Sequence, residues 1–174
     1  APGLGALAAA RGGRDSRLAG NLAALGVSAD DISVVSKHDT STNANDPNEA
    51  ELHSLIAQAL GRSEGNPLYV VSQKTLTGHS KGGAALFQLA GLTQIFASGL
   101  IPGNMALDCM DPVFEEDSFL VWPRSPFQHE GVKAGLISSL GFGHVSALLA
   151  LAAPGAFEAA VERAHGADRV EEWK

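Results

Sequence analysis

The stretch Lys74–Gly83 contains residue types that could support two different chemistries. Read as GHSKG, residues 78–82 match the G-x-S-x-G turn that exposes a nucleophilic serine in hydrolases, which would make Ser80 the nucleophile. Read instead from Lys74 to His79, the stretch places a lysine and a histidine just before an apolar helix. A histidine there could donate a hydrogen bond to a carbonyl oxygen that is becoming an enolate, and the lysine could stabilise the developing negative charge.

The residues that precede Gly78 favour the histidine chemistry. A nucleophile elbow follows directly from a buried strand, which is normally a continuous apolar run. Here the apolar run ends at Val71, and the polar segment SQKTLT separates it from Gly78. No glycine-rich oxyanion loop precedes it in the sequence. A serine esterase of the α/β-hydrolase type that uses Ser80 is therefore the alternative hypothesis.

A second cluster of polar residues lies upstream, at His38, Thr40, Thr42, Asp46 and Glu49. It directly follows a predicted strand, and loops that leave strand ends are where α/β proteins build their sites. The two threonine hydroxyls point the same way if the loop is extended. Asp46 is predicted to cap the next helix, and Glu49 lies three residues later, as in a capping box.

The elements that must position these clusters alternate between helices and strands. Helices are expected over 16–25, 46–60 and 82–98, and strands over 31–36, 68–71, 119–122 and 131–138. The apolar segment 144–152 is expected to be a buried helix, and the tail 157–165 a charged amphipathic helix outside the core. This alternation indicates a layered α/β domain.

Composition narrows the class of protein. The 174 residues suffice for one domain with a real core, and the net charge of −7 argues against a nucleic-acid partner. No apolar run is clean enough to span a bilayer, and the N-terminus lacks the basic region of a signal peptide. The single cysteine excludes an internal disulfide and fits a cytoplasmic location. The six histidines show no zinc-ligand spacing, so no metal is expected.

Three of these patterns, in this order, resemble motifs of the β-ketoacyl synthases. Residues 38–49 resemble the first histidine motif, H-G-T-x-T-x-x-x-D-x-x-E, and residues 74–82 resemble the second, K-x-x-x-G-H-x-x-G. Residues 141–143, GFG, resemble the late glycine–phenylalanine turn. The segments TGHSKG, IPGN and SLGFG narrow the resemblance to the condensing domain of giant type I fatty acid synthases of fungi and actinobacteria. The alanine- and glycine-rich composition suits the bacterial form.

The resemblance implies a thiolase-like fold, of which this chain would form the C-terminal half, a layered α/β/α unit over residues 1–155. Residues 156–174 would be a C-terminal helical extension. The nucleophilic cysteine of the family lies in the other half, so the chain is expected to be a piece of a larger protein and inactive alone. Cys109 does not fill that role, because it lies in a different sequence context between acidic residues. Asp39 departs from the family's usual glycine and could alter the loop beside His38.

The activity implied by the resemblance is a decarboxylative Claisen condensation between an acyl thioester and malonyl on acyl carrier protein. His38 and His79 would hold the thioester carbonyl oxygen and stabilise the enolate. Lys74, with Glu49 as its partner, would set the local charge, and Asp46 would support the site.

The resemblance also implies how substrates and partners are bound. Thr40 and Thr42 would bind the amides of the phosphopantetheine arm of the carrier, and Phe142 would gate the acyl pocket. No cofactor would be bound directly by this chain. The expected partners are the acyl carrier protein domain, the N-terminal half of the synthase, the other synthase domains and further copies in a homo-oligomer.

Overall fold

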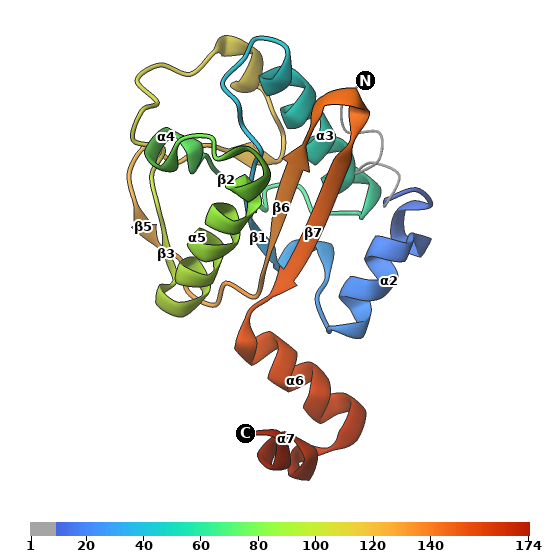
Figure 1. The fold of residues 1–174 in the computed structure, drawn as a ribbon. Helices are drawn as coiled ribbons and strands as arrows, with labels where there is room; N and C mark the ends of the chain where they lie inside the picture. The colour runs from blue at the N-terminus through green and yellow to red at the C-terminus, as the bar shows by residue number, and fades with distance from the viewer. Residues whose placement is uncertain (1–9) are drawn as a thin grey trace.

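The computed structural model describes residues 10–174, built around a five-stranded mixed sheet (Figure 1). Its strands, in spatial order, are β4 (Leu120–Val121), β2 (Leu68–Val71), β1 (Ile32–Ser36), β6 (Ala134–Leu140) and β7 (Ser146–Ala152). β1 pairs in parallel with β2 and β6, whereas β7 runs antiparallel to β6. All five residues of β1 are buried, as expected for an apolar, β-branched strand at the centre of a sheet.

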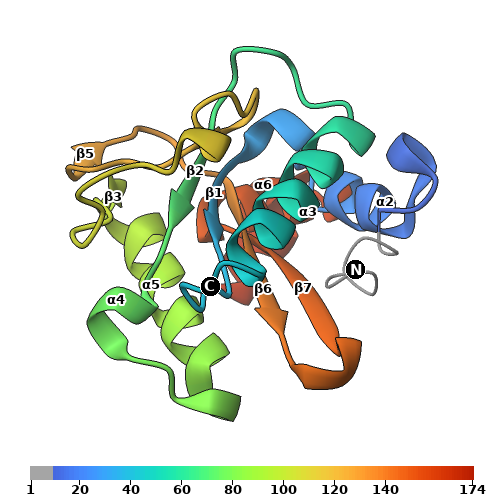
Figure 2. The same cartoon turned by 90° about the horizontal axis from the view of Figure 1, so that it is seen from above.

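Helices cover both faces of this sheet (Figure 2). On one face, α2 (Arg17–Ala24) and α3 (Asn45–Ala59) contribute to a core around Val35. On the other face, α5 (Ala84–Ser98) packs Leu92 and Ile95 into a second core around Val34. The neighbouring residues Val34 and Val35 therefore point into opposite cores, and the chain leaves β1 between the two helical layers.

The remaining elements are short or lie at the ends of the chain. They are α4 (Lys74–Thr77), β3 (Leu100–Ile101), β5 (Phe127–Gln128), α6 (Pro154–His165), α7 (Ala167–Trp173) and the 3₁₀ turns at Gly13–Asp15, Ala29–Asp31, Lys81–Gly83, Pro112–Phe114 and Phe142–His144. Figure 1 shows α6 and α7 extending beyond the end of β7, away from the sheet. Within residues 10–174, no helix has the length and apolar character needed to cross a membrane. The N-terminal segment that was predicted not to be a signal peptide lies largely outside the described residues.

One predicted element is wrong: residues 146–152 form strand β7 and not a helix. The whole strand pairs with β6, in a register that runs from Ala134 opposite Ala152 to Leu140 opposite Ser146. A short apolar run is compatible with either a strand or a buried helix. Pairing with β6 decides between them, because the turn at residues 141–145 returns the chain directly alongside it.

The predicted start of the second helix is also wrong. α3 begins at Asn45, with Ala44 at the N-cap, and the Thr42 hydroxyl accepts a hydrogen bond from the Asn45 amide at 3.2 Å. Asp46 lies inside the first turn and does not cap it. Glu49 does not complete a capping box either, because its carboxylate is taken by backbone amides of the preceding loop.

Candidate active site

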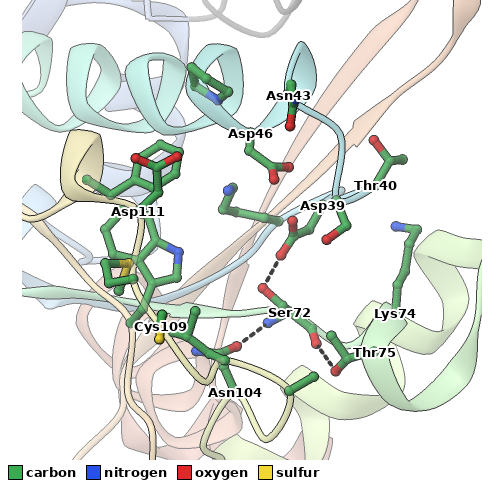
Figure 3. A pocket seen from close by; sticks show the side chains of 18 of the residues that line it. Asp39, Thr40, Asn43, Asp46, Ser72, Lys74, Thr75, Asn104, Cys109 and Asp111 are labelled. Atoms are coloured by element: carbon green, nitrogen blue, oxygen red, sulfur yellow. Dashed lines mark hydrogen bonds between the residues drawn. The ribbon is translucent and has the colours of Figure 1, made fainter.

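The polar residues singled out in the sequence gather where the chain leaves β1 and β2. Figure 3 shows Thr40, Asp46 and Lys74 among them. The two strands are parallel neighbours, so their carboxyl ends lie at the same edge of the sheet. A cavity of about 640 Å³ opens there, and its lining includes Asp39, Asp46, Lys74 and His79. The cavity is large enough for an extended small-molecule group.

The two predicted histidines lie against each other beside this cavity. The His38 and His79 rings meet edge to face, with centroids 5.2 Å apart and planes at 84°. Lys74, from α4, donates a hydrogen bond to the backbone carbonyl of His38, and its Nζ lies 3.4 Å from His38 Nδ1. The structure therefore brings Lys74 and His79 together with His38, which lies 41 positions before His79 in the sequence.

Within the described part of the chain, the hydrogen bonds of both rings engage Nδ1 and leave Nε2 as the available donor. His38 Nδ1 faces the Lys74 ammonium, which can only donate, and His79 Nδ1 accepts from the Lys81 amide at 3.0 Å. In a neutral imidazole the proton must then sit on Nε2. Burial and the Lys74 charge lower the pKa of His38, which favours this neutral form. Each ring can thus offer an Nε2–H group to an oxygen atom.

The predicted pairing of Lys74 with Glu49 is wrong. Among residues 10–174, Lys74 makes its hydrogen bonds to His38, and its ammonium has no carboxylate within 4.0 Å. Burial lowers the pKa of Lys74, while the charges of Glu49 and Asp39 oppose that shift. Lys74 therefore acts on His38 directly.

Glu49 instead binds the backbone of the histidine loop. Its two carboxylate oxygens accept from the amides of His38 at 2.5 Å and Asp39 at 2.8 Å. Burial would raise the pKa of this carboxyl, but electrostatic interactions with His53 and Lys37 and its hydrogen bonds outweigh burial and lower the pKa overall. Glu49 is therefore an ionised, fully buried acceptor that fixes the start of the loop.

Two carboxylates form an acidic side of the cavity (Figure 3). Asp39 has a φ of 46°, in the left-handed region that favours glycine, and aspartate is one of the residues that tolerate it. This conformation explains how aspartate replaces the usual glycine, and the Asp39 carboxylate accepts a hydrogen bond from the Ser72 hydroxyl. Burial and the nearby Asp39 charge raise the pKa of Asp46, whose Oδ1 has no hydrogen-bond partner among residues 10–174.

The three predicted substrate-binding residues are placed differently from one another. Thr40 lies in the wall of the cavity (Figure 3), whereas Thr42 is not part of that wall and instead accepts the Asn45 amide. Phe142 is fully exposed in the turn between β6 and β7 and does not line the cavity. Only Thr40 thus faces the site within this chain, and the roles of Thr42 and Phe142 are still predictions.

Two amide side chains that the sequence did not single out hold the strand ends in place. Gln88, from α5, donates to the carbonyls of Ser36 at 2.8 Å and Lys37 at 2.7 Å. Asn104 accepts from the Ser72 amide at 2.9 Å and donates to the Val70 carbonyl at 2.9 Å. Gln88 is one of two glutamines in a largely apolar helix, and it is the buried one; Asn104 lies in the quoted segment IPGN.

Ser80 lacks the setting of a hydrolase nucleophile. The short helix α4, and not a strand, leads into Gly78, and Ser80 has an ordinary φ of −81°. Among histidine side chains that the structure describes, none forms a hydrogen bond with the Ser80 hydroxyl. A nucleophile elbow needs a sharp strand-to-helix turn and an adjacent base.

Acid is expected to loosen the loop around His38 because of His53, a fully buried residue of α3. Burial lowers the pKa of His53 from 6.5 to about 4. Between these values the unfolded chain binds a proton that the folded chain does not. The free energy of unfolding should therefore fall as the pH is lowered through this window, by about 3 kcal/mol in all.

Hydrogen exchange measures this loss. The β1 and α3 amides of the full-length protein are followed from pH 7 to pH 4, and the measured rates are corrected for the pH dependence of exchange in an unfolded chain. His53→Gln cannot take up the proton and should lack this part of the pH dependence. An unchanged slope in the variant would show that another group is responsible.

Comparison with known proteins places this site in a family. Residues 4–108 match the family model described as the beta-ketoacyl synthase, C-terminal domain. The chain is 43% identical over 150 residues to fatty acid synthase subunit alpha of Candida albicans, a match that covers 86% of this chain and 8% of that relative. It is 45% identical over 133 residues to the same subunit of Saccharomyces cerevisiae, covering 75% of this chain and 7% of the relative.

Solved structures of ketosynthases have the same fold. The noncanonical ketosynthase FabY of P. aeruginosa superposes with a TM-score of 0.80 at 23% identity, over 99% of this chain and 26% of that one. A type II polyketide ketosynthase in complex with its acyl-carrier protein superposes with a TM-score of 0.63 at 22% identity, over 78% of this chain and 31% of that one. The predicted thiolase-like α/β fold is confirmed.

The chain spans less than a tenth of the length of the fatty acid synthase subunits that it matches. The family match nevertheless covers more than half of the chain, including the loops that carry His38, Lys74 and His79. The predicted resemblance is therefore confirmed, and the chain belongs to the β-ketoacyl synthase C-terminal domain family.

Proposed function

We propose that this chain is the histidine-bearing half of a β-ketoacyl synthase domain that elongates acyl chains in fatty acid synthesis. The observation that carries the proposal is the pair His38 and His79, with rings 5.2 Å apart and each Nδ1 already engaged. Two Nε2–H donors beside one cavity suit the stabilisation of a thioester oxygen as it becomes an enolate.

The chemistry needs a nucleophile that the other half of the domain supplies. A cysteine there carries the acyl group as a thioester, and malonyl arrives on acyl carrier protein. The bond from the malonyl Cα to its carboxylate breaks, carbon dioxide leaves, and the electron pair forms the enolate. The Cα then attacks the acyl carbonyl carbon, and the cysteine thiolate departs. This chain alone, without that cysteine, is inactive.

The residues of this chain have distinct parts in that sequence. His38 and His79 donate to the malonyl thioester oxygen, and about 3 kcal/mol of stabilisation for each donor would lower the barrier substantially. Lys74 keeps His38 neutral and correctly protonated. Thr40 and Thr42 bind the phosphopantetheine arm, and Phe142 closes the acyl pocket once the other half of the domain is in place.

The reaction stoichiometry separates this function from the alternative esterase. The full-length protein, given an acyl thioester and malonyl on acyl carrier protein, should release one carbon dioxide for each new β-ketoacyl product. Hydrolysis of the acyl thioester to a free acid, without carbon dioxide release, would contradict the proposal and favour the esterase.

A fluorophosphonate probe is expected to leave Ser80 unlabelled in the full-length protein, because no base lies beside its hydroxyl among the described side chains. Ser80→Ala should keep condensation within about twofold of wild type, since the side chain is exposed and makes no hydrogen bond to the site. Peptide mapping by mass spectrometry measures the labelling, with a known serine esterase as positive control. Stoichiometric modification of Ser80 would overturn the assignment.

A further inference from the structure

A chain of buried side chains, none of which lines the cavity, is hydrogen-bonded to the backbone of His38. The backbone amide of His38 donates to Glu49 Oε1 at 2.5 Å and lies 3.2 Å from the hydroxyl of Ser138. The Ser138 hydroxyl is 2.5 Å from the same Glu49 oxygen and 3.0 Å from His53 Nε2. Glu49, His53 and Ser138 are all completely buried.

The protons of this network can be placed from the chemistry of its members. A carboxylate can only accept, so the single hydroxyl proton of Ser138 goes to Glu49. The lone pairs of Ser138 then accept from the His38 amide and from His53, whose proton must lie on Nε2. His53 Nδ1 is left as a buried acceptor without a hydrogen-bond partner among the described residues, which fits a neutral ring.

The network connects three elements that are remote in sequence. His53 and Glu49 lie on α3, Ser138 lies on β6, and His38 follows β1. β1 and β6 are parallel neighbours, with Ser36 opposite Ile137, so Ser138 reaches the residue that leaves β1. The side-chain amide of Gln88 also lies near the carbonyls of Lys37 and Ser138, at 2.7 Å and 3.2 Å, which ties the same two strand ends together.

His38 depends on these side chains because it lies past the end of its strand. Its amide is held by Glu49 and Ser138, and not by the ladder of a neighbouring strand. A shift of this backbone moves the imidazole relative to His79 and to the cavity. Neither His53 nor Ser138 lines the cavity, so both can act only through His38.

We infer that His53 and Ser138 are positioning residues, which hold the backbone of His38 through Glu49 and so set where its Nε2–H points. This inference rests on the proposed function, because it matters only if His38 acts in the reaction. Groups that orient metal-ligating histidines typically change activity about 10- to 100-fold when they are removed, and we expect a loss of the same order for groups that orient His38. The effect should fall on kcat, because the geometry of the enolate donor matters most in the transition state.

The test compares two substitutions of His53 in the full-length protein. His53→Gln keeps an N–H donor near the position of Nε2, whereas His53→Leu has a similar apolar bulk and no donor. Ile56→Val is the matched control, because Ile56 lies on the same helix, is equally buried and makes no hydrogen bond to the network. Steady-state condensation kinetics and thermal unfolding are measured for all of them.

We expect His53→Leu to lower kcat by about 10-fold or more with KM changed less than about twofold. His53→Gln should restore most of kcat, and Ile56→Val should change stability without changing kcat. The inference is overturned if His53→Leu has the kcat of the Ile56→Val control, or if His53→Gln is as slow as His53→Leu.

A second pair of variants keeps the test decisive if His53→Leu does not fold. Ser138→Ala removes the hydroxyl that links His53 to Glu49, and Ser138→Thr retains it. The inference is supported if Ser138→Ala turns over slowly and Ser138→Thr does not. It is contradicted if the two variants turn over at the same rate. His38→Ala distinguishes the two ways in which the inference can fail. If His38 has no part in the reaction, His38→Ala leaves turnover unchanged. If only the positioning role of His53 and Ser138 is wrong, His38→Ala is still slow.

Discussion

Replacing His79 with alanine is expected to lower the kcat of condensation by about 100- to 1,000-fold, the loss typical of removing one donor to a developing oxyanion. The expected size follows from the site. His79 already accepts the Lys81 amide at Nδ1, which leaves Nε2–H to face the substrate, and its ring packs edge to face on His38. The full-length protein, assayed for β-ketoacyl product with saturating malonyl and acyl thioesters, gives this number.

A control histidine separates this effect from a general loss of charge or structure. His165 is exposed at the end of α6, outside the described cavity, and His165→Ala should stay within about twofold of wild type. The double variant His38→Ala/His79→Ala should be little slower than either single variant, because residues that act on one transition state are not additive. Turnover of His79→Ala equal to that of His165→Ala would contradict the role given to His79.

Replacing Glu49 with alanine is expected to cost about 3–5 kcal/mol of stability in the folded domain. The substitution leaves the buried amides of His38 and Asp39 without their acceptor, at about 1–3 kcal/mol for each unsatisfied group. It also removes the acceptor of the Ser138 hydroxyl. Condensation should be lost together with the stability, because the loop that carries His38 is no longer fixed.

Glu51→Ala provides the matched control for Glu49→Ala. Glu51 lies two residues further along α3 and is exposed, so its removal should change stability by less than about 0.5 kcal/mol. Hydrogen exchange of the β1 and α3 amides in the full-length protein compares the two variants. Equal protection in both would show that the Glu49 carboxylate does not hold the loop.

Much of the fold could be predicted because the local signals are strong and agree with the tertiary structure. The β-branched segment 31–36 became the central strand β1, and the apolar run 68–71 became β2 beside it. The helix predicted to end at Gly99 does so, and that glycine has a φ of 69°, which suits a helix terminus. In each case the hydrophobic pattern, the residue propensities and the residues that end the element all indicated the same secondary structure.

The errors arose where a local rule competed with long-range contacts. The run 146–152 is rich in alanine and leucine, which favour a helix, but pairing along its whole length with β6 outweighs that local preference. Asp46 and Glu49 have the spacing of a capping box, but Glu49 binds the histidine loop and leaves Asp46 facing the cavity. The short helix α4 has only four residues and no periodic pattern by which to recognise it.

The candidate site was predictable in its reactive residues and not in their support. His38, Lys74 and His79 follow two strands in recognisable motifs, so their meeting at one sheet edge could be expected. Ser138 lies 100 residues from His38, and only the register of β1 against β6 brings it to that backbone. A serine in a buried strand and a histidine four residues after a glutamate are too common in sequences to reveal such a network.

The most direct measurement is the release of carbon dioxide from malonyl on acyl carrier protein by the full-length protein loaded with an acyl chain. Enolate formation is the step that His38 and His79 are proposed to assist, and carbon dioxide release reports it without the later bond formation. If the two imidazoles stabilise the enolate, His38→Ala and His79→Ala should each slow this release by about 100-fold or more while the protein stays folded. Release at the wild-type rate in either folded variant would show that the substituted histidine does not stabilise the enolate.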